Sequence, residues 1–166
     1  MKILSPSECS IWLKREDCRE NPYGRRSFSS ASSLQFATSR AEGAVSRMVH
    51  GIRTILGSPR SYLFQVTDWS RYVEHENSNL SDLESKGSGN PFDAWGIVFE
   101  AGEADEMFEC CISVVDCGMS AYLYAPQIAT ILFWEGNLVD VWTNEPELRN
   151  QLAQWARNEQ FRITRF

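Results

Sequence analysis

Acidic side chains and one of the two histidines gather in a polar segment near the middle of the chain. The segment covers residues 74–90, and its candidate binding residues are Glu74, His75, Glu76, Asp82 and Glu84. Carboxylates and an imidazole can bind a hard divalent cation or exchange protons with a substrate. Their spacing follows no established ligand pattern, and charge runs of this kind are more often solvated surface. We therefore expect a binding loop here and predict no metal ligand in it.

Five cysteines are the other reactive side chains, namely Cys9, Cys18, Cys110, Cys111 and Cys117. No two of them form a Cys-x-x-Cys pair, and no histidine is placed to complete a zinc site. A nucleophilic cysteine would need a base, and His50 could serve if the fold brought it to Cys110 or Asp116. The alternative, which we favour, is that the cysteines are small buried apolar side chains in a reducing compartment.

Three sequence motifs that identify common nucleotide-binding or catalytic sites do not occur in the sequence. There is no glycine-rich phosphate loop, no Gly-x-Ser-x-Gly turn and no His-Glu-x-x-His helix. We accordingly predict no catalytic residue and no cofactor, and a non-enzymatic function is favoured.

Tryptophans stand beside carboxylates in the second half of the chain. The candidate binding residues of this kind are Trp69, Trp134, Glu135, Asp140 and Trp142. Large aromatic side chains are enriched in the centres of protein interfaces. The pattern suits a protein-binding surface, although most such rings are expected to be core.

Charge is divided unevenly along the chain, whose net charge is -6. Residues 1–60 hold ten basic and five acidic side chains, and the rest of the chain holds six basic and seventeen acidic ones. Such a division predicts either an acidic surface or two oppositely charged layers that face each other. An acidic surface would select a partner protein with a basic surface, and it makes nucleic acid an unfavourable partner.

The elements that must position these residues are clearest between residues 94 and 142. Apolar runs predict strands at 94–99, 120–124, 128–134 and 138–142, and a three- and four-residue period predicts a helix at 103–117. Strand, helix and strand in that order favour a parallel pair. Gly136-Asn137 predicts a tight hairpin turn in which the glycine has a positive φ.

The flanking segments add further elements. Ser5, Pro6 and Glu8 predict a capped helix that ends near Cys18, and a long helix is expected over residues 32–56. Residues 62–67 read as a strand. Asn144 is the expected cap of a helix at 145–157, and residues 161–166 could form a last edge strand.

These elements predict one α+β domain over residues 1–166, mainly helical in 1–60 and sheet-forming in 61–166. Its mixed twisted sheet should have about five or six strands, with one long helix and two or three shorter helices packed on it. No apolar run approaches a membrane span, and a cytoplasmic location is expected.

The favoured function is a protein-binding module, most concretely an inhibitor or immunity-type protein whose acidic surface occupies a basic partner. This class is an analogy with other small acidic proteins. One alternative is a small hydrolase or transferase that uses the 74–90 loop. Another is a nucleic-acid accessory protein that uses Arg25, Arg26, Arg40 and Arg47.

Overall fold

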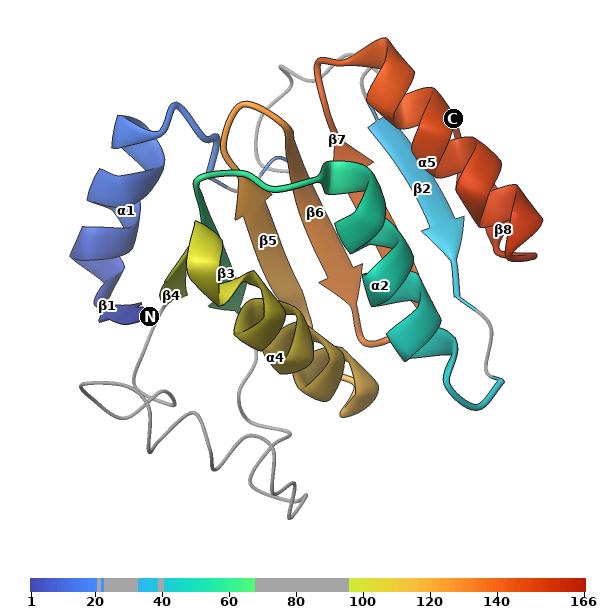
Figure 1. Cartoon of the computed structure of the whole chain (residues 1–166), viewed down its shortest axis with the longest axis horizontal. Helices are drawn as coiled ribbons and strands as arrows, with labels where there is room; N and C mark the ends of the chain where they lie inside the picture. Colours follow the sequence, from blue (N-terminus) through green and yellow to red (C-terminus); the bar gives the residue numbers. More distant parts are fainter. Residues whose placement is uncertain (21, 23–32, 39–40, 68–95) are drawn as a thin grey trace.

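The computed structural model describes residues 1–20, 22, 33–38, 41–67 and 96–166. These residues form an antiparallel sheet of eight strands with helices on both faces (Figure 1). The strands are β1 (Lys2–Leu4), β2 (Ser33–Ala37), β3 (Ser61–Val66), β4 (Gly96–Glu100), β5 (Ala121–Ala125), β6 (Ala129–Trp134), β7 (Leu138–Trp142) and β8 (Arg162–Arg165). The helices are α1 (Pro6–Arg15), α2 (Ala44–Leu56), α4 (Ala104–Asp116) and α5 (Pro146–Asn158), with a short 3-10 helix η5 (Ala101–Glu103) before α4. The strand order is β1-β4-β3-β5-β6-β7-β2-β8.

Two hydrophobic clusters lie on opposite faces of this sheet, because successive side chains of a strand point to opposite sides. Phe64 and Ile97 belong to the larger cluster, which packs under α2, α4 and α5. Leu63 and Val98 belong to the smaller cluster, which includes Trp12 of α1. We call the two sides the three-helix face and the α1 face. The α+β class is confirmed.

The predicted parallel pair is wrong. β4 and β5 flank β3, which lies between them and pairs antiparallel with both. A single sequence shows which strands follow one another but not which strand is inserted between them. The sheet also has eight strands where five or six were predicted, because β1 is only three residues long and β2 was read as helix.

The predicted helix over residues 32–56 is correct only in its second part, which is α2. Its first part contains β2, in which Leu34 and Phe36 are both fully buried. These two residues follow the two-residue period of a strand, and pairing of β2 with β7 and β8 decides between the two periods. Gly43, with a φ of 71°, stands before the first turn of α2.

Apart from the end of α1, the boundaries of the other expected elements differ from the predicted ones by at most two residues. The hairpin turn is centred on Glu135 and Gly136, not on Gly136 and Asn137, since the Asn137 N–H donates to the Trp134 carbonyl at 2.8 Å. Gly136 has the expected positive φ, 69°. The residue at the start of α5 is Glu145 and not the predicted Asn144, and its side chain makes no capping hydrogen bond.

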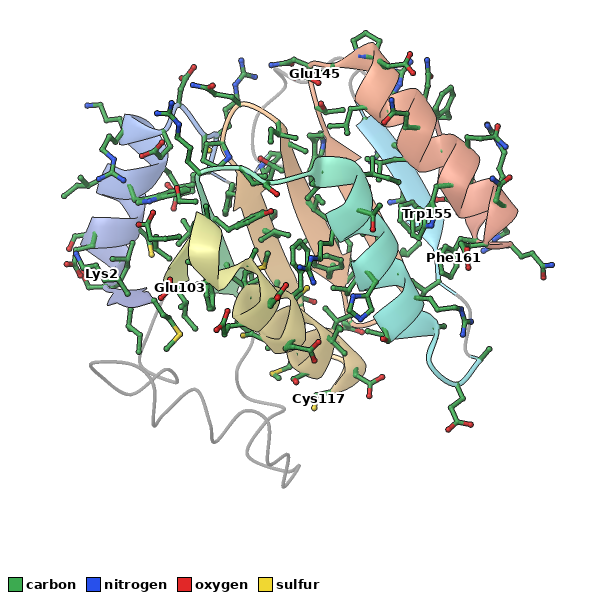
Figure 2. The ribbon with its side chains drawn as sticks, viewed as in Figure 1. Lys2, Glu103, Cys117, Glu145, Trp155 and Phe161 are labelled. Carbon is green, nitrogen blue, oxygen red and sulfur yellow. The ribbon has the colours of Figure 1, made fainter. Side chains whose placement is uncertain are left out.

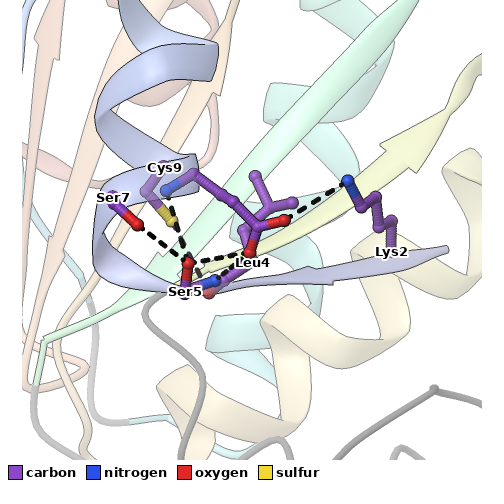
Figure 3. Close-up of polar contacts among 6 residues, drawn as sticks. Lys2, Leu4, Ser5, Ser7 and Cys9 are labelled. Carbon is purple, nitrogen blue, oxygen red and sulfur yellow. Dashed lines mark hydrogen bonds and ion pairs between the residues drawn. The ribbon is translucent and has the colours of Figure 1, made fainter.

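The first helix begins with the capping box that its sequence predicts (Figure 3). Ser5 Oγ accepts a hydrogen bond from the Glu8 N–H at 3.4 Å, and Glu8 Oε2 accepts one from the Ser5 N–H at 2.9 Å. The helix ends at Arg15, before the predicted end near Cys18. The box fixes the direction in which α1 leaves the edge strand β1.

Replacing Ser5 with alanine should lower the free energy of unfolding by about 1 kcal/mol, because a first-turn N–H loses its acceptor. The Ser5 N–H and hydroxyl also lower the pKa of the Glu8 carboxyl. That contribution is present above the ordinary pKa of a glutamate and is lost as the pH falls through the lowered value. Urea unfolding at neutral pH measures the change. Ser10→Ala, on the exposed side of the same helix, is the control, and equal losses in both variants would contradict a capping role.

Candidate functional site

The predicted binding residues fall into two groups. Six of them lie outside the residues that the structure describes, namely Trp69, Glu74, His75, Glu76, Asp82 and Glu84. The predicted loop over residues 74–90 lies there too. Four are described, and they come from β6, β7 and the turn between these strands, namely Trp134, Glu135, Asp140 and Trp142.

Asp140 lies at the centre of a polar network on the α1 face. Gln35 Nε2 donates to both of its carboxylate oxygens, at 2.9 and 3.1 Å, and Trp134 Nε1 donates to Oδ2 at 2.9 Å. Arg165 of β8 donates to Oδ1 at 2.6 Å, and Thr164 in turn donates to Gln35 Oε1 at 2.7 Å. We call these five residues the Asp140 network. It joins four neighbouring strands, since β6, β7, β2 and β8 are consecutive in the sheet.

The network shows that Asp140 is an internal charge. Its side chain has no exposed surface, and the Arg165 guanidinium lies against it. Trp142 is also buried, in the smaller hydrophobic cluster with Tyr124 and Leu132. Trp134, by contrast, is 40% exposed, and Glu135 beside it is exposed. The structure therefore places two of the four described residues in the interior and two at the surface.

Exposed carboxylates form a stripe along α4, the acidic stripe, made of Asp105, Glu106, Glu109 and Asp116. Their spacing of three, four and seven residues puts them on one side of the helix. Glu103 and Cys117, labelled in Figure 2, mark the two ends of α4. Between residues 96 and 148 the chain contains no lysine or arginine. In the described structure one ion pair reaches the stripe, from Arg53 of α2 to Asp105.

The turn between β6 and β7 extends this surface. A side chain at Gly136 would come within 2.9 Å of the Val115 carbonyl oxygen, so the turn lies against the last turn of α4. Ser120 Oγ, just after α4, accepts a hydrogen bond from the Glu135 N–H at 3.2 Å. Glu135 is thus carried at the end of α4 where Asp116 lies, whereas the Trp134 indole lies on the α1 face, where it donates to Asp140.

The C-terminal part of the acidic stripe is unfavourable for the isolated helix, whereas Asp105 and Glu106 stand in the first turn, where the helix dipole favours carboxylates. Asp105 and Glu109, and Glu106 and Glu109, are like charges at helical neighbour spacings. Asp116 stands in the last turn, where the helix dipole favours a cation, and that turn holds no basic residue. Sequence reasoning identified the helix and missed its outer face as a site. The signal was the long interval without lysine or arginine.

The cysteines have the environment of buried apolar side chains. Cys9, Cys110 and Cys111 are buried, and Cys18 and Cys117 are partly exposed. Burial raises the pKa of Cys9 to about 11 and that of Cys110 to about 12. Burial also raises the pKa of Cys18 to about 11. These thiols are protonated at neutral pH. His50 is exposed on α2, and the disfavoured alternative of a pair between His50 and the buried Cys110 is not seen among the described contacts.

Native and unfolded protein should differ sharply in thiol reactivity. At pH 8 we expect Cys9, Cys110 and Cys111 to resist a thiol-exchange reagent, because burial keeps them protonated and out of its reach. All five cysteines should react within minutes in denaturant. Mass spectrometry of the labelled peptides identifies the sites. Fast native labelling of Cys110 would contradict its burial.

Of the four arginines considered for nucleic-acid contact, one lies in the described part of the chain. Arg25, Arg26 and Arg40 lie beyond the described part of the chain. The Nε atom of Arg47 lies 4.0 Å from Oε2 of Glu159, at the end of α5. Together with the Arg53–Asp105 pair, this contact shows that two N-terminal arginines face acidic side chains of the second half.

A hollow of about 200 Å³ opens where the end of α1 meets the β5–β6 turn and the end of β7. Arg19, Gln127, Trp142 and Asn144 are among the residues that line it. In the described part of the chain, no group of three or more His, Cys, Asp or Glu side chains could hold a metal ion. None of the described helices is long and apolar enough to cross a membrane.

Comparison with known proteins gives no match to a family model, to a curated protein or to a solved structure.

Proposed function

We propose that the protein is a non-enzymatic binding module whose acidic surface occupies a basic site on a partner protein, as inhibitor and immunity-type proteins do. The observation that supports this proposal is the acidic stripe. Four carboxylates lie on one exposed side of α4, in an interval of the chain without a single lysine or arginine. A basic partner would supply the missing countercharges and would be steered toward the stripe by its field.

The contact surface in this proposal runs along α4 and continues onto the β6–β7 turn. Asp116 and Glu135 lie at that end. The exposed carboxylates suit the polar rim of an interface. Asp140 and Trp142 are buried on the α1 face and do not belong to this surface.

A test of the proposal reverses the charge of the stripe. The variant Glu106→Lys/Glu109→Lys/Asp116→Lys and wild type are immobilised and exposed to an extract of the source cells. We expect wild type to retain one basic protein stoichiometrically and the variant to lose it, and the purified protein should show at least about a hundredfold weaker binding to the variant. Glu42→Lys/Glu145→Lys/Glu147→Lys changes the net charge by the same amount at exposed positions elsewhere and should bind normally.

Two outcomes would overturn the proposal. Equal loss in both triple variants would mean that net charge matters and the stripe does not. Retention of DNA or RNA, in place of a protein, would support the nucleic-acid alternative. If the retained partner is an enzyme or a toxin, inhibition of its activity by wild type distinguishes an inhibitor from a simple binding module.

Stability separates a binding role of the stripe from a structural one. The variant Glu109→Gln/Asp116→Asn should raise the free energy of unfolding by about 0.5–1 kcal/mol, because it removes like-charge neighbours and a carboxylate at the wrong end of the helix dipole. The same variant should bind the partner more weakly. Thermal and urea unfolding measure the first effect. A destabilised variant would show that the stripe contributes to the fold itself.

A further inference from the structure

The last strand of the sheet, β8, has an open edge. It pairs with β2 on one side and stands at the end of the strand order, so in the described structure its other side has no strand partner. Arg162, Thr164 and Arg165 are exposed, and Ile163 is half-buried. An open edge presents unpaired N–H and C=O groups that can form hydrogen bonds with a further strand.

Basic side chains gather at this edge. Arg149 and Arg157 of α5 and Arg162 and Arg165 of β8 are the four basic residues of the chain after residue 95. The Arg149 guanidinium lies 4.6 Å from the centre of the Phe166 ring, and that of Arg157 lies 5.6 Å from it. We call β8 with these four arginines the basic edge. In Figure 1, α5 and β8 lie at one end of the sheet, and α4 packs over β3, β4 and β5 toward the other.

Two side chains hold β8 in place, and a third leaves its charge available. Arg165 binds the carboxylate of Asp140, and Thr164 binds Gln35, so β8 is tied to its neighbours. Arg162 has no ion pair among the described contacts, and the 51% exposed Phe166 adds an apolar surface beside it. The other edge strand, β1, is shorter, and the amino group of Met1, just before it, is bound to Glu103.

The charges at this edge select the kind of strand that can be added. Pairing of β8 with β8 of a second copy would bring arginines of the two strands close to one another, and like charges across a strand pair are destabilising. The same arginines attract a strand that carries carboxylates. A phosphate backbone would satisfy the guanidinium groups and leave the unpaired backbone groups of β8 without partners.

We propose that the basic edge binds an extended acidic segment of a second protein, which adds to β8 as a further strand of the sheet. Backbone hydrogen bonds supply the register, and alternate carboxylates on one face of the added strand lie beside Arg162. This site is distinct from the acidic stripe in position and in sign, so either proposal can fail without the other.

The test uses the full chain and fluorescein-labelled model peptides, followed by fluorescence anisotropy. The peptide Glu-Val-Glu-Val-Glu-Val combines charge with strand propensity. Glu-Gly-Glu-Gly-Glu-Gly keeps the charge and loses the propensity, and Lys-Val-Lys-Val-Lys-Val reverses the charge. We expect the first peptide to bind about tenfold more tightly than the second and the third not to bind. Arg162→Glu should weaken binding about fivefold, and Lys14→Glu, the matched reversal on α1, should leave it unchanged.

Amide hydrogen exchange distinguishes strand addition from simple charge attraction. Saturation with Glu-Val-Glu-Val-Glu-Val should slow exchange of β8 amides about tenfold, because new backbone hydrogen bonds protect them. Unchanged β8 exchange at saturation, equal affinity for the two acidic peptides, or no binding of either would overturn the proposal. So would displacement of the bound peptide by duplex DNA at an equal concentration of charge, which would assign the arginines to a phosphate backbone.

Discussion

Asp140→Asn should destabilise the protein by about 2 kcal/mol, and Asp140→Ala by about 3 kcal/mol, although neither change removes an apolar side chain from the core. The carboxylate has no exposed surface and accepts from Gln35, Trp134 and Arg165. Asparagine has one oxygen and one NH₂ group in place of the two carboxylate oxygens of Asp140. In either orientation its NH₂ group therefore faces a neighbouring side chain that is itself a hydrogen-bond donor. Arg165 is 41% exposed and can be hydrated, which keeps the loss below that of a fully buried ion pair.

Urea unfolding of these variants measures the effect, and Glu42→Gln, a change at an exposed carboxylate, is the control, expected within about 0.5 kcal/mol of wild type. The double variant Asp140→Asn/Arg165→Gln should recover part of the loss, with a coupling of at least about 1 kcal/mol. Additive losses would show that the Asp140–Arg165 pair does not hold β8. The network also predicts altered Trp134 fluorescence in Asp140→Ala, because the indole loses its acceptor.

Gly51→Val should cost about 3 kcal/mol, and Gly51→Ala about 1–2 kcal/mol. A Cβ atom at Gly51 would lie 2.1 Å from the Trp155 ring, a distance that requires α2 and α5 to move apart. The ring cannot swing away freely, because it makes edge contacts with Phe36 and Phe161 at centroid distances of 6.0 and 5.5 Å. Alanine itself favours a helix over glycine by about 1 kcal/mol, which offsets part of the clash.

A matched control is Gly102→Ala in η5, where nothing lies within 4 Å of the added atom, and no loss above about 0.5 kcal/mol is expected. In Gly51→Ala/Trp155→Ala the added methyl group enters space that the indole has vacated. The two losses should then be less than additive by at least about 1 kcal/mol. A Gly51→Ala variant as stable as wild type would show that the helices can separate at little cost.

Gly51 also shows what sequence reasoning can predict about packing. A glycine within a helix favours close approach of a neighbouring element, and Trp155 of α5 does approach Gly51. Trp155 lies more than a hundred residues from Gly51 in the sequence, and no residue near Gly51 indicates which element packs against it. Local signals, such as the Ser5–Glu8 capping box and the glycine of the β6–β7 turn, were predictable because the cause and the effect are a few residues apart.

Long-range order was less predictable. Leu34 and Phe36 fit a strand only once β7 and β8 are known to flank them, and the insertion of β3 between β4 and β5 follows from no local pattern. The same holds for the candidate site. The acidity of residues 96–148 was visible in the sequence, but the burial of Asp140 and the exposure of the α4 carboxylates depend on which face of the sheet each element covers.

The position of β2 in the sheet constrains the order in which the chain can fold during synthesis on the ribosome. Gln35 bonds to Asp140 and to Thr164, 105 and 129 residues further along the chain. Until β7 has left the exit tunnel, β2 has no neighbour, and until β8 has followed, its second side is open. β2 must therefore wait unpaired, and closure of such long loops makes assembly of this part of the sheet a late and slow step.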